Sequence, residues 1–374
     1  MPDSIDYMER YACQVRLKEF GADAQQRLQQ SKVLVIGAGG LGCPALLYLA
    51  AAGIGTIGIV DDDVVQLSNL HRQVLYTQED VGKSKAETAA KKLKQQNPGV
   101  TVIAHKLRIT NKEALSIISN YDLVMDGSDN FATRFMINDA CVLLNKPLIF
   151  GAVAQTEGQV GIFNHSNEGE PANYRDLFPH LLPDDAAASC REQGILGVVP
   201  GVIGLMMATE AIKLISGKGK TLSNKILSYN CFTNQFYQFE ISSKESSKQF
   251  TPQTAEAFLQ TDYLQQSANR EWTEIDGEQV NEILSHPKSI LVDVRSENEL
   301  PVIQHIQCIR IPVESLASQQ ELFQQASEII VVCAAGVRSR IGAGTLYKLF
   351  GNSKQIYSLK GGIQQWKENL NIFS

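Results

Sequence analysis

The chain has 374 residues, of which 44% are hydrophobic and 20% charged, and its formal net charge is -6 at pH 7. This composition is typical of a soluble globular protein of two or three domains, and the acidic balance argues against a nucleic-acid partner. The opening MPDSIDYMER is charged and lacks an apolar core, so we expect no signal peptide and a cytoplasmic location. The longest apolar region, 198–215, contains Pro200, Glu210 and Lys213, so we expect a buried helix there and no membrane partner.

The number and spacing of the cysteines limit which redox compartment and which metal sites are possible. Seven are scattered along the chain, and no two form a C-x-x-C pair. An odd, dispersed set argues against a disulfide framework, and a tetrahedral structural zinc has no four-thiolate site to occupy. We therefore expect a reducing cytoplasm and no zinc.

Strand and helix patterns alternate along the first 240 residues, which predicts an α/β fold with a Rossmann-like, mostly parallel sheet covered by helices on both faces. The predicted helices cover 6–20, 22–30, 41–52, 82–96, 112–119, 130–144 and 202–216, and the predicted strands cover 33–36, 57–60, 100–104, 122–125, 147–150, 226–230 and 235–240. A more irregular region begins at 160–164. The stretch 165–197 has few regular signals, and a loop of that length is usually functional or mobile.

Composition shifts after Ile241, which predicts three parts: a first domain over 1–242, a linker over 243–270 with a short helix near 255–259, and a second, smaller α/β domain over 271–374. Within the last part, helices are predicted over 277–285 and 339–350, and strands over 290–294, 328–333 and 355–357.

The glycine turn GAGGLG follows the first predicted strand and opens a helix. Gly37 permits a tight turn, Gly39 lets a phosphate approach the backbone, and Gly42 lets the helix pack close to the strand. The helix N-terminus offers free N–H groups to phosphate. Asp61 ends the second strand, where an acid can meet a ribose hydroxyl. This unit predicts a nucleotide site and leaves NAD, FAD and ATP open.

Charged and polar residues further along discriminate among these nucleotides. Asn69, Arg72, Lys85 and Asp129 supply an amide, two cations and an acid around one glycine turn. An enzyme that cleaves ATP between its α- and β-phosphates needs cations for the leaving pyrophosphate, and an acid at a strand end can hold Mg2+. A nicotinamide oxidoreductase needs neither these cations nor Mg2+. Taken singly, Arg72 or Lys85 is more often a solvated surface charge, but the set favours ATP with Mg2+.

Four runs together resemble the MoeB/ThiF adenylating enzymes, bacterial relatives of ubiquitin-activating enzymes: GAGGLG, D-x-D-x-V-x-x-S-N-L-x-R-Q at 61–73, VGKSKAE and DGSDNFATR. The resemblance implies a homodimer that uses ATP to adenylate the C-terminal glycine of a ubiquitin-like sulfur carrier protein ending in Gly-Gly. It implies catalysis by Arg72 and Mg2+ binding by Asp129. The implied nucleotide-binding residues are Gly37, Gly39, Gly40, Gly42, Asp61, Asp63, Asn69, Arg72, Lys85, Asp129 and Asn130.

This sequence departs from the family pattern at Cys13 and at the zinc-binding cysteines, and it retains a cysteine at position 190. Relatives usually carry an arginine that reaches the partner subunit's ATP where this chain has Cys13, and a thiol cannot neutralise a phosphate. Either Arg10 or Arg16 substitutes, or adenylation is weakened. The paired zinc cysteines of many relatives are replaced by PANYR at 171–175, and no pair follows at the second position. Cys190 lies where relatives carry a cysteine that can form an acyl thioester or persulfide, so it is a catalytic candidate; the alternative is a small buried cysteine.

In the second domain, IIVVCAAGVRSR runs from a predicted strand into Cys333, a short loop and a helix. Loop N–H groups, the helix N-terminus and Arg338 would stabilise a thiolate or persulfide anion. With the D-V-R-x-x-x-E, H-I-x-x-x-x-x-I-P and L-x-G-G-x-x-x-W runs, this region resembles the rhodanese domain. The resemblance implies that Cys333 carries sulfane sulfur from a donor such as a cysteine desulfurase or thiosulfate, while Asp293 and Arg295 form scaffold.

The two resemblances together imply adenylation of the carrier's C-terminal glycine, followed by persulfide sulfur transfer that yields a thiocarboxylate. Molybdopterin (molybdenum cofactor) biosynthesis is the favoured destination of that sulfur, and thiamine thiazole synthesis and tRNA thiolation are alternatives. A protein of another class, a sulfur relay with a weakened adenylation site, is the rival reading.

Overall fold

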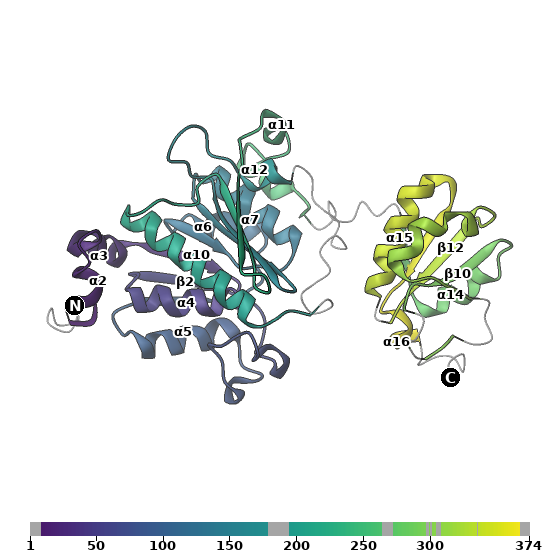
Figure 1. Cartoon of the computed structure of the whole chain (residues 1–374), viewed down its shortest axis with the longest axis horizontal. Coiled ribbons are helices and arrows are strands. Elements are labelled where there is room, and N and C mark those ends of the chain that lie inside the picture. The colour runs from purple at the N-terminus through teal and green to yellow at the C-terminus, as the bar shows by residue number, and fades with distance from the viewer. Residues whose placement is uncertain are drawn as a thin grey trace. The chain divides into compact units, whose positions relative to one another are not determined.

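The computed structural model describes residues 9–178, 194–263, 272–296, 299, 301–303, 308–334 and 336–366. These residues form two compact units, one containing the described residues up to Tyr263 and the other those from Trp272 onward (Figure 1).

The first unit is built on an eight-stranded sheet in the order β3-β2-β1-β4-β5-β6-β7-β8. Its strands are β1 (Lys32–Ile36), β2 (Thr56–Val60), β3 (Thr101–His105), β4 (Leu123–Asp126), β5 (Leu148–Ala154), β6 (Glu157–Phe163), β7 (Lys225–Asn230) and β8 (Gln235–Glu240). Strands β3, β2, β1, β4 and β5 are parallel, and β6, β7 and β8 continue the sheet antiparallel. The predicted mostly parallel α/β sheet is confirmed.

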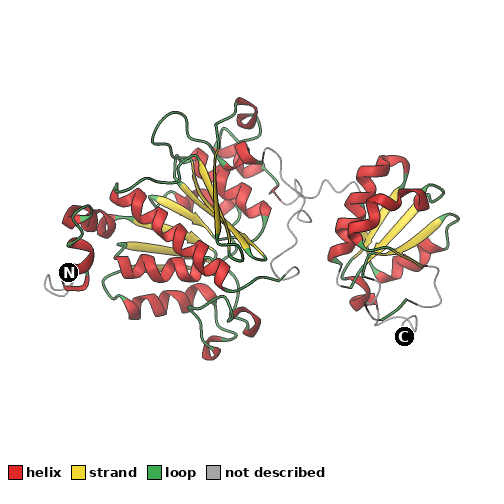
Figure 2. Cartoon of the chain, viewed as in Figure 1, coloured by secondary structure: helices red, strands yellow, loops and turns green. Residues whose placement is uncertain are grey.

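Helices cover both faces of this sheet (Figure 2). They are α2 (Ala12–Val15), α3 (Gly21–Gln30), α4 (Gly42–Ala52), α5 (Lys85–Gln96), α6 (Asn111–Ile118), α7 (Phe131–Leu143), α8 (Tyr174–Leu177), α10 (Val198–Ser216), α11 (Glu245–Lys248) and α12 (Ala255–Gln260). One apolar core includes Leu46, Ile57 and Ile203, and the other includes Phe135 and Phe163. The sheet is thus buried on both sides, which explains why its parallel strands read as continuous apolar runs.

Among the described residues, α10 is the one helix long and apolar enough, by length and composition, to cross a membrane. It packs against α4 and against strands β5 and β6. Its Glu210 side chain is buried and accepts a hydrogen bond from the backbone N–H of Leu222 at 2.8 Å. These contacts make α10 a core helix of the first unit, as its interrupting charges suggested.

Strand β6 and the N-terminal helical region differ from the sequence-based expectation. Strand β6 forms an antiparallel hairpin with β5, although its sequence suggested an irregular region. Gly158 and Gly161 obscure the strand pattern, and both are required, because an added Cβ would lie 2.3 Å from Ile203 and 2.4 Å from the Lys225 carbonyl oxygen. The helix predicted over 6–20 is interrupted in its described part: residues 9–10 and α2 are helical, a turn at Tyr11 separates them, and residues 16–20 form turns.

The second unit has a five-stranded parallel sheet in the order β11-β10-β12-β13-β9. Its elements are β9 (Thr273–Ile275), α14 (Gly277–Leu284), β10 (Ser289–Asp293), β11 (Cys308–Arg310), a 3-10 segment (Val313–Phe323), β12 (Glu328–Val332), α15 (Val337–Phe350), β13 (Gln355–Leu359) and α16 (Gly362–Trp366). Apolar clusters lie on both faces. The sequence did not predict β9 and β11, because three residues are too few to show a periodic pattern.

Candidate functional site

The carboxyl ends of β1, β2 and β4 meet at one edge of the first sheet. Ile36 pairs with Val60 on one side and with Asp126 on the other, and each strand ends at that pair. Ligands of open parallel sheets bind at this edge, where the strand order reverses. The glycine turn, the acids after β2 and the acid at the end of β4 therefore converge.

The glycines of the turn have different roles. Gly37 has a φ of +91°, and an added Cβ would lie 2.8 Å from the Gly127 carbonyl oxygen. At Gly42 an added Cβ would lie 2.0 Å from the Gly37 carbonyl oxygen. Backbone geometry therefore demands both glycines. At Gly39 the nearest atom is Nε2 of Gln73 at 3.7 Å, so the space over this residue is open to a ligand.

Asp61 braces the turn from the end of β2. Its Oδ2 accepts a hydrogen bond from the Ala38 N–H at 2.8 Å, and its Oδ1 accepts one from the Asp63 N–H at 2.9 Å. Burial raises the pKa of this carboxyl, and the positive charge of Lys85 opposes the shift. Each oxygen keeps a second lone pair, so the carboxylate can still accept a ribose hydroxyl.

Lys85 is the first residue of α5, and its side chain is almost fully buried. Its Nζ donates to Oδ2 of Asp63 at 2.7 Å. The Tyr76 hydroxyl lies 3.0 Å from the Ala38 carbonyl oxygen and 3.2 Å from that of Lys85, and so ties the start of α5 to the glycine turn. The structure therefore brings Asp61, Asp63, Lys85 and the turn together.

The segment around the 3-10 turn Leu67–Asn69 supplies free polar atoms. Asn69 and Gln73 are buried, and Oδ1 of the first and Oε1 of the second have no hydrogen-bond partner among the described residues. Arg72 lies beside the turn, with its Cδ 3.5 Å from where a Cβ on Gly40 would stand. Unpaired buried polar atoms are costly unless a ligand or water satisfies them, so these two acceptor oxygens fit a ligand that donates hydrogen bonds.

Gln73 was not among the predicted binding residues, although it closes the S-N-L-x-R-Q run. The same holds for Ser128 and Arg134 in the run DGSDNFATR. Arg134 donates through Nη2 to the Ser128 carbonyl oxygen at 2.9 Å, while its Nε and the Ser128 hydroxyl have no partner among the described residues. Burial raises the pKa of the adjacent Asp126, and Arg134 opposes that shift. In the sequence, Gln73, Ser128 and Arg134 could have been found from their positions within these two motifs.

Asp129 and Asn130 follow β4. Asp129 is exposed, whereas Asn130 caps α7, with its Oδ1 accepting the Thr133 N–H at 2.9 Å. In the described part of the chain, no three His, Cys, Asp or Glu side chains gather as a metal site. One carboxylate nevertheless suits Mg2+, which usually keeps several waters and binds substrate phosphates.

The structure describes one of the two candidate cysteines in the first part of the chain, Cys13 but not Cys190. Cys13 is exposed on α2. Arg10 donates to the Gln96 carbonyl oxygen at 3.3 Å, within its own chain, while Arg16 is exposed. Cys190 lies outside the described residues.

In the second unit, Cys333 follows β12 and is buried. Its Sγ donates to the Ser339 hydroxyl at 3.6 Å, and the Ser358 hydroxyl donates to the same Ser339 oxygen at 3.0 Å. Both serines are fully buried. An added Cβ on Gly362 would lie 2.4 Å from the Cys333 carbonyl oxygen, so the L-x-G-G run lets a second loop pack against the cysteine loop. The sequence pattern did not indicate the serine pair, because Ser358 comes from another strand.

Arg338, near the start of α15, already forms an ion pair with Glu299. Its guanidinium binds Glu299 through two hydrogen bonds, one of 2.7 Å, with both side chains about one-third exposed. The pair raises the pKa of Arg338, and Arg338 lowers the pKa of Glu299 to about 2. Asp293 is bound by Arg295 at 2.7 Å and by Arg310 at 2.8 Å, which is a scaffold arrangement.

Comparison with known proteins adds the following similarities. The ThiF family model matches residues 11–250, and the rhodanese-like domain model matches residues 276–369. The chain is 49% identical over 236 residues to the sulfur carrier protein adenylyltransferase of Thermus thermophilus, covering 63% of this chain and 87% of that one. It is 38% identical over 383 residues to the "Probable adenylyltransferase/sulfurtransferase MoeZ" of Mycobacterium tuberculosis, covering 98% and 94%.

It is also 38% identical over 368 residues to the "Probable molybdopterin-synthase adenylyltransferase" of Porphyra purpurea, covering 97% of this chain and 94% of that one. Among solved structures, a crystal structure of Escherichia coli MccB with MccA-N7isoASN matches with a TM-score of 0.56 and 24% identity, covering 63% of this chain and 72% of that one. At that identity the structural match shows a shared fold.

Proposed function

Because this chain belongs to the ThiF family and continues into a rhodanese-like domain, we propose that it is an adenylyltransferase and sulfurtransferase acting on a ubiquitin-like sulfur carrier protein. The observation that carries this proposal is that one chain holds both the glycine turn, with the buried Lys85 paired to Asp63, and the Cys333 loop. The name of the Porphyra purpurea relative, which matches 97% of this chain, favours molybdopterin (molybdenum cofactor) biosynthesis as the destination of the sulfur.

In the first step, the carrier's C-terminal carboxylate attacks the α-phosphorus of ATP. An acyl–phosphate bond forms, the bond between the α-phosphorus and the bridging oxygen breaks, and pyrophosphate leaves. The open backbone at Gly39 and the free oxygens of Asn69 and Gln73 would hold the nucleotide, while Arg72 and Lys85 would offset the charge on the leaving group. Mg2+, which we assign to Asp129, would neutralise further phosphate charge.

In the second step, the terminal sulfur of a Cys333 persulfide attacks the acyl carbon and displaces AMP. The product is an acyl disulfide that links the carrier to Cys333. A second thiolate, for which Cys190 is the candidate, attacks the Cys333 sulfur, releases the carrier thiocarboxylate and leaves a protein disulfide that a thiol reductant reopens. We assign the loading of Cys333 to a cysteine desulfurase or thiosulfate in the cytoplasm.

We also propose a zinc-free homodimer. The segment 171–175 is held by side chains: Arg175 pairs with Asp139 at 2.6 Å, and the Tyr174 N–H donates to Oδ1 of Asn138 at 2.8 Å. These contacts can hold the segment without a metal. Metal analysis that finds one zinc per chain would contradict this proposal.

ATP–pyrophosphate exchange with a purified carrier ending in Gly-Gly tests the assignment. We expect exchange that requires the intact carrier, that is lost in Lys85→Met, and that is retained in Cys333→Ala. The last variant should lose sulfur transfer from thiosulfate. A carrier lacking its final glycine is the matched control. Wild-type protein that transfers sulfur without any exchange would identify a sulfur relay instead.

A further inference from the structure

The chain does not leave the first unit after β8. Residues Lys244–Tyr263, which we call the strap, include α11 and α12 and pack against α6, α7 and α8. Phe258 of α12 is fully buried and belongs to the same apolar core as Phe135 of α7. Composition alone assigned this whole segment to a linker with a short helix near 255–259, because its few apolar residues form no periodic run. The strap is instead a docked part of the first unit.

The beginning of the strap is anchored at α8. Oδ1 of Asp176 accepts hydrogen bonds from the Lys244 N–H at 2.7 Å and from the Ser247 hydroxyl at 2.5 Å. The Lys244 ammonium donates to the Asp176 carbonyl oxygen at 2.9 Å. Asp176 and Ser247 are both buried, so water competes little for these bonds.

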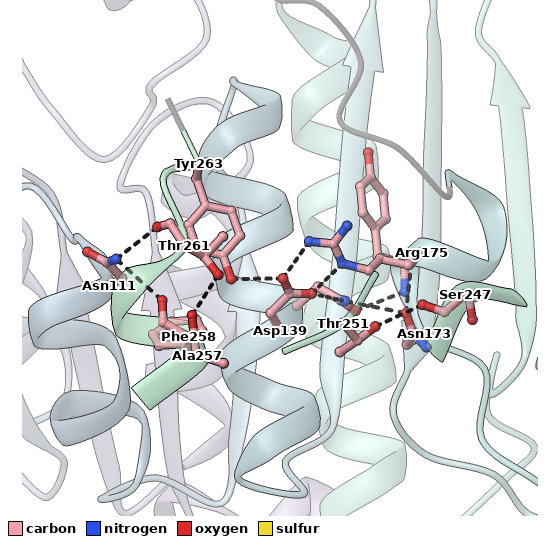
Figure 3. A network of polar contacts seen from close by, with 12 residues as sticks. Asn111, Asp139, Asn173, Arg175, Ser247, Thr251, Ala257, Phe258, Thr261 and Tyr263 are labelled. Atoms are coloured by element: carbon pink, nitrogen blue, oxygen red, sulfur yellow. Dashed lines mark hydrogen bonds and ion pairs between the residues drawn. The ribbon is translucent and has the colours of Figure 1, made fainter. Parts of the chain in front are cut away.

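The end of the strap is anchored on α7 by a buried charge network (Figure 3). The Tyr263 hydroxyl donates to Oδ2 of Asp139 at 2.8 Å, and Arg175 binds both oxygens of that carboxylate, at 2.7 and 2.6 Å. All three residues are buried. Burial and the neighbouring Asp139 raise the pKa of Tyr263, so its hydroxyl remains a donor at neutral pH.

A third anchor places the end of the strap relative to the nucleotide edge. The side-chain amide of Asn111 donates to the carbonyl oxygens of Leu259 at 2.9 Å and of Thr261 at 3.1 Å. Asn111 is the first residue of α6, which follows β3, so it lies at the carboxyl edge of the parallel sheet. The strap therefore ends on the same edge as the glycine turn.

Docking of the strap sets how far the chain can reach. Eight residues, 264–271, join Tyr263 to Trp272, whereas 28 residues, 244–271, would join the units if the strap were undocked. Fully extended, these spans reach roughly 30 Å and roughly 100 Å. For a tether long enough to span its two sites, the effective concentration falls as about the −3/2 power of its length, so undocking would lower it about 6.5-fold.

We propose that the strap is a positioning element that shortens the tether of the sulfurtransferase unit and thereby raises the effective concentration of Cys333 at the acyl-adenylate. This inference rests on the proposed function. Tyr263, Asp139 and Asn111 act through the tether, because their hydrogen bonds hold the strap in place.

Two variants of the full-length protein test this role. In the first, about sixteen Gly and Ser residues are inserted between Tyr263 and Trp272, which leaves the strap docked and lengthens the tether about threefold. In the second, Phe258→Ala with Tyr263→Phe releases the end of the strap, and hydrogen exchange at 255–263 reports that release. Tyr237→Phe, an exposed hydroxyl deletion on β8, is the matched control.

Single-turnover transfer from preloaded Cys333 to adenylated carrier is the readout. The insertion should slow it about fivefold by the −3/2 scaling, while ATP–pyrophosphate exchange and thiosulfate sulfurtransferase rates stay at wild-type values. The release variant should slow it several-fold with the same two rates preserved. Wild-type transfer by the insertion variant overturns the inference. Loss of exchange or of all transfer in the wild type instead overturns the proposed function.

Discussion

Replacing Gly39 with alanine separates a ligand-facing glycine from the structural glycines beside it. Gly39 is not among the residues with positive φ, and an added Cβ meets nothing nearer than 3.7 Å. An alanine that fits the native backbone lowers the entropy of the unfolded chain and stabilises by about 0.4–1 kcal/mol. Gly39→Ala should therefore fold, with a free energy of unfolding at or above that of the wild type.

The same methyl group occupies the space through which a phosphate would approach the turn. We expect the KM for ATP to rise at least about tenfold, equivalent to about 1.4 kcal/mol of lost binding. Gly42→Ala is the matched control, because its Cβ would lie 2.0 Å from the Gly37 carbonyl oxygen. The required backbone shift should lower stability by about 1–3 kcal/mol or more.

ATP–pyrophosphate exchange across a range of ATP concentrations gives the KM, and urea unfolding gives the stability of each variant. The reasoning predicts a stable Gly39→Ala with weak ATP use and an unstable Gly42→Ala. A Gly39→Ala protein with wild-type KM would refute the assignment of this backbone to phosphate. Instability of Gly39→Ala would instead refute the claim that the space above it is open.

Three further predictions concern charged side chains and hydrogen bonds. Cys13→Arg adds a cation at an exposed position and should speed ATP–pyrophosphate exchange; an unchanged or slower rate would count against a missing phosphate contact. Ser339→Ala removes the hydroxyl that accepts a hydrogen bond from the Cys333 thiol at 3.6 Å; loss of a contact worth about 1 kcal/mol should slow sulfur transfer roughly fivefold, and wild-type transfer would contradict this. Burial disfavours the charged form of Asp80, but hydrogen bonds from Lys92 and Thr77 outweigh this effect and lower the pKa of Asp80 to about 2. The carboxylate thus stabilises the fold above its unfolded pKa of about 3.9, and that stability is lost as pH falls toward 2. Asp80→Asn should lower stability at pH 7 and make no difference at pH 2, and an equal loss at both pH values would refute the linkage.

Much of the fold was available from local sequence patterns. Continuous apolar runs at 33–36 and 122–125 predicted buried parallel strands, and the helices at 41–52 and 130–144 end within one residue of α4 and α7. The glycine turn showed where a nucleotide could bind, because backbone geometry and helix N-termini constrain such turns to few sequences. Strand β6 escaped prediction because its glycines are selected by contacts with Ile203 and Lys225, which are distant in sequence.

The sequence by itself determined the fold class, the family and the residue types of both sites, since these depend on periodicity and on spacing along the chain. Only the tertiary structure decided which of those residues are already paired. It showed Arg338 bound to Glu299, Cys333 in contact with Ser339, and the Tyr263 hydroxyl on the carboxylate of Asp139, 124 residues away. Hydrogen bonds and ion pairs depend on distance in space, and no local pattern encodes a partner that another helix or strand supplies.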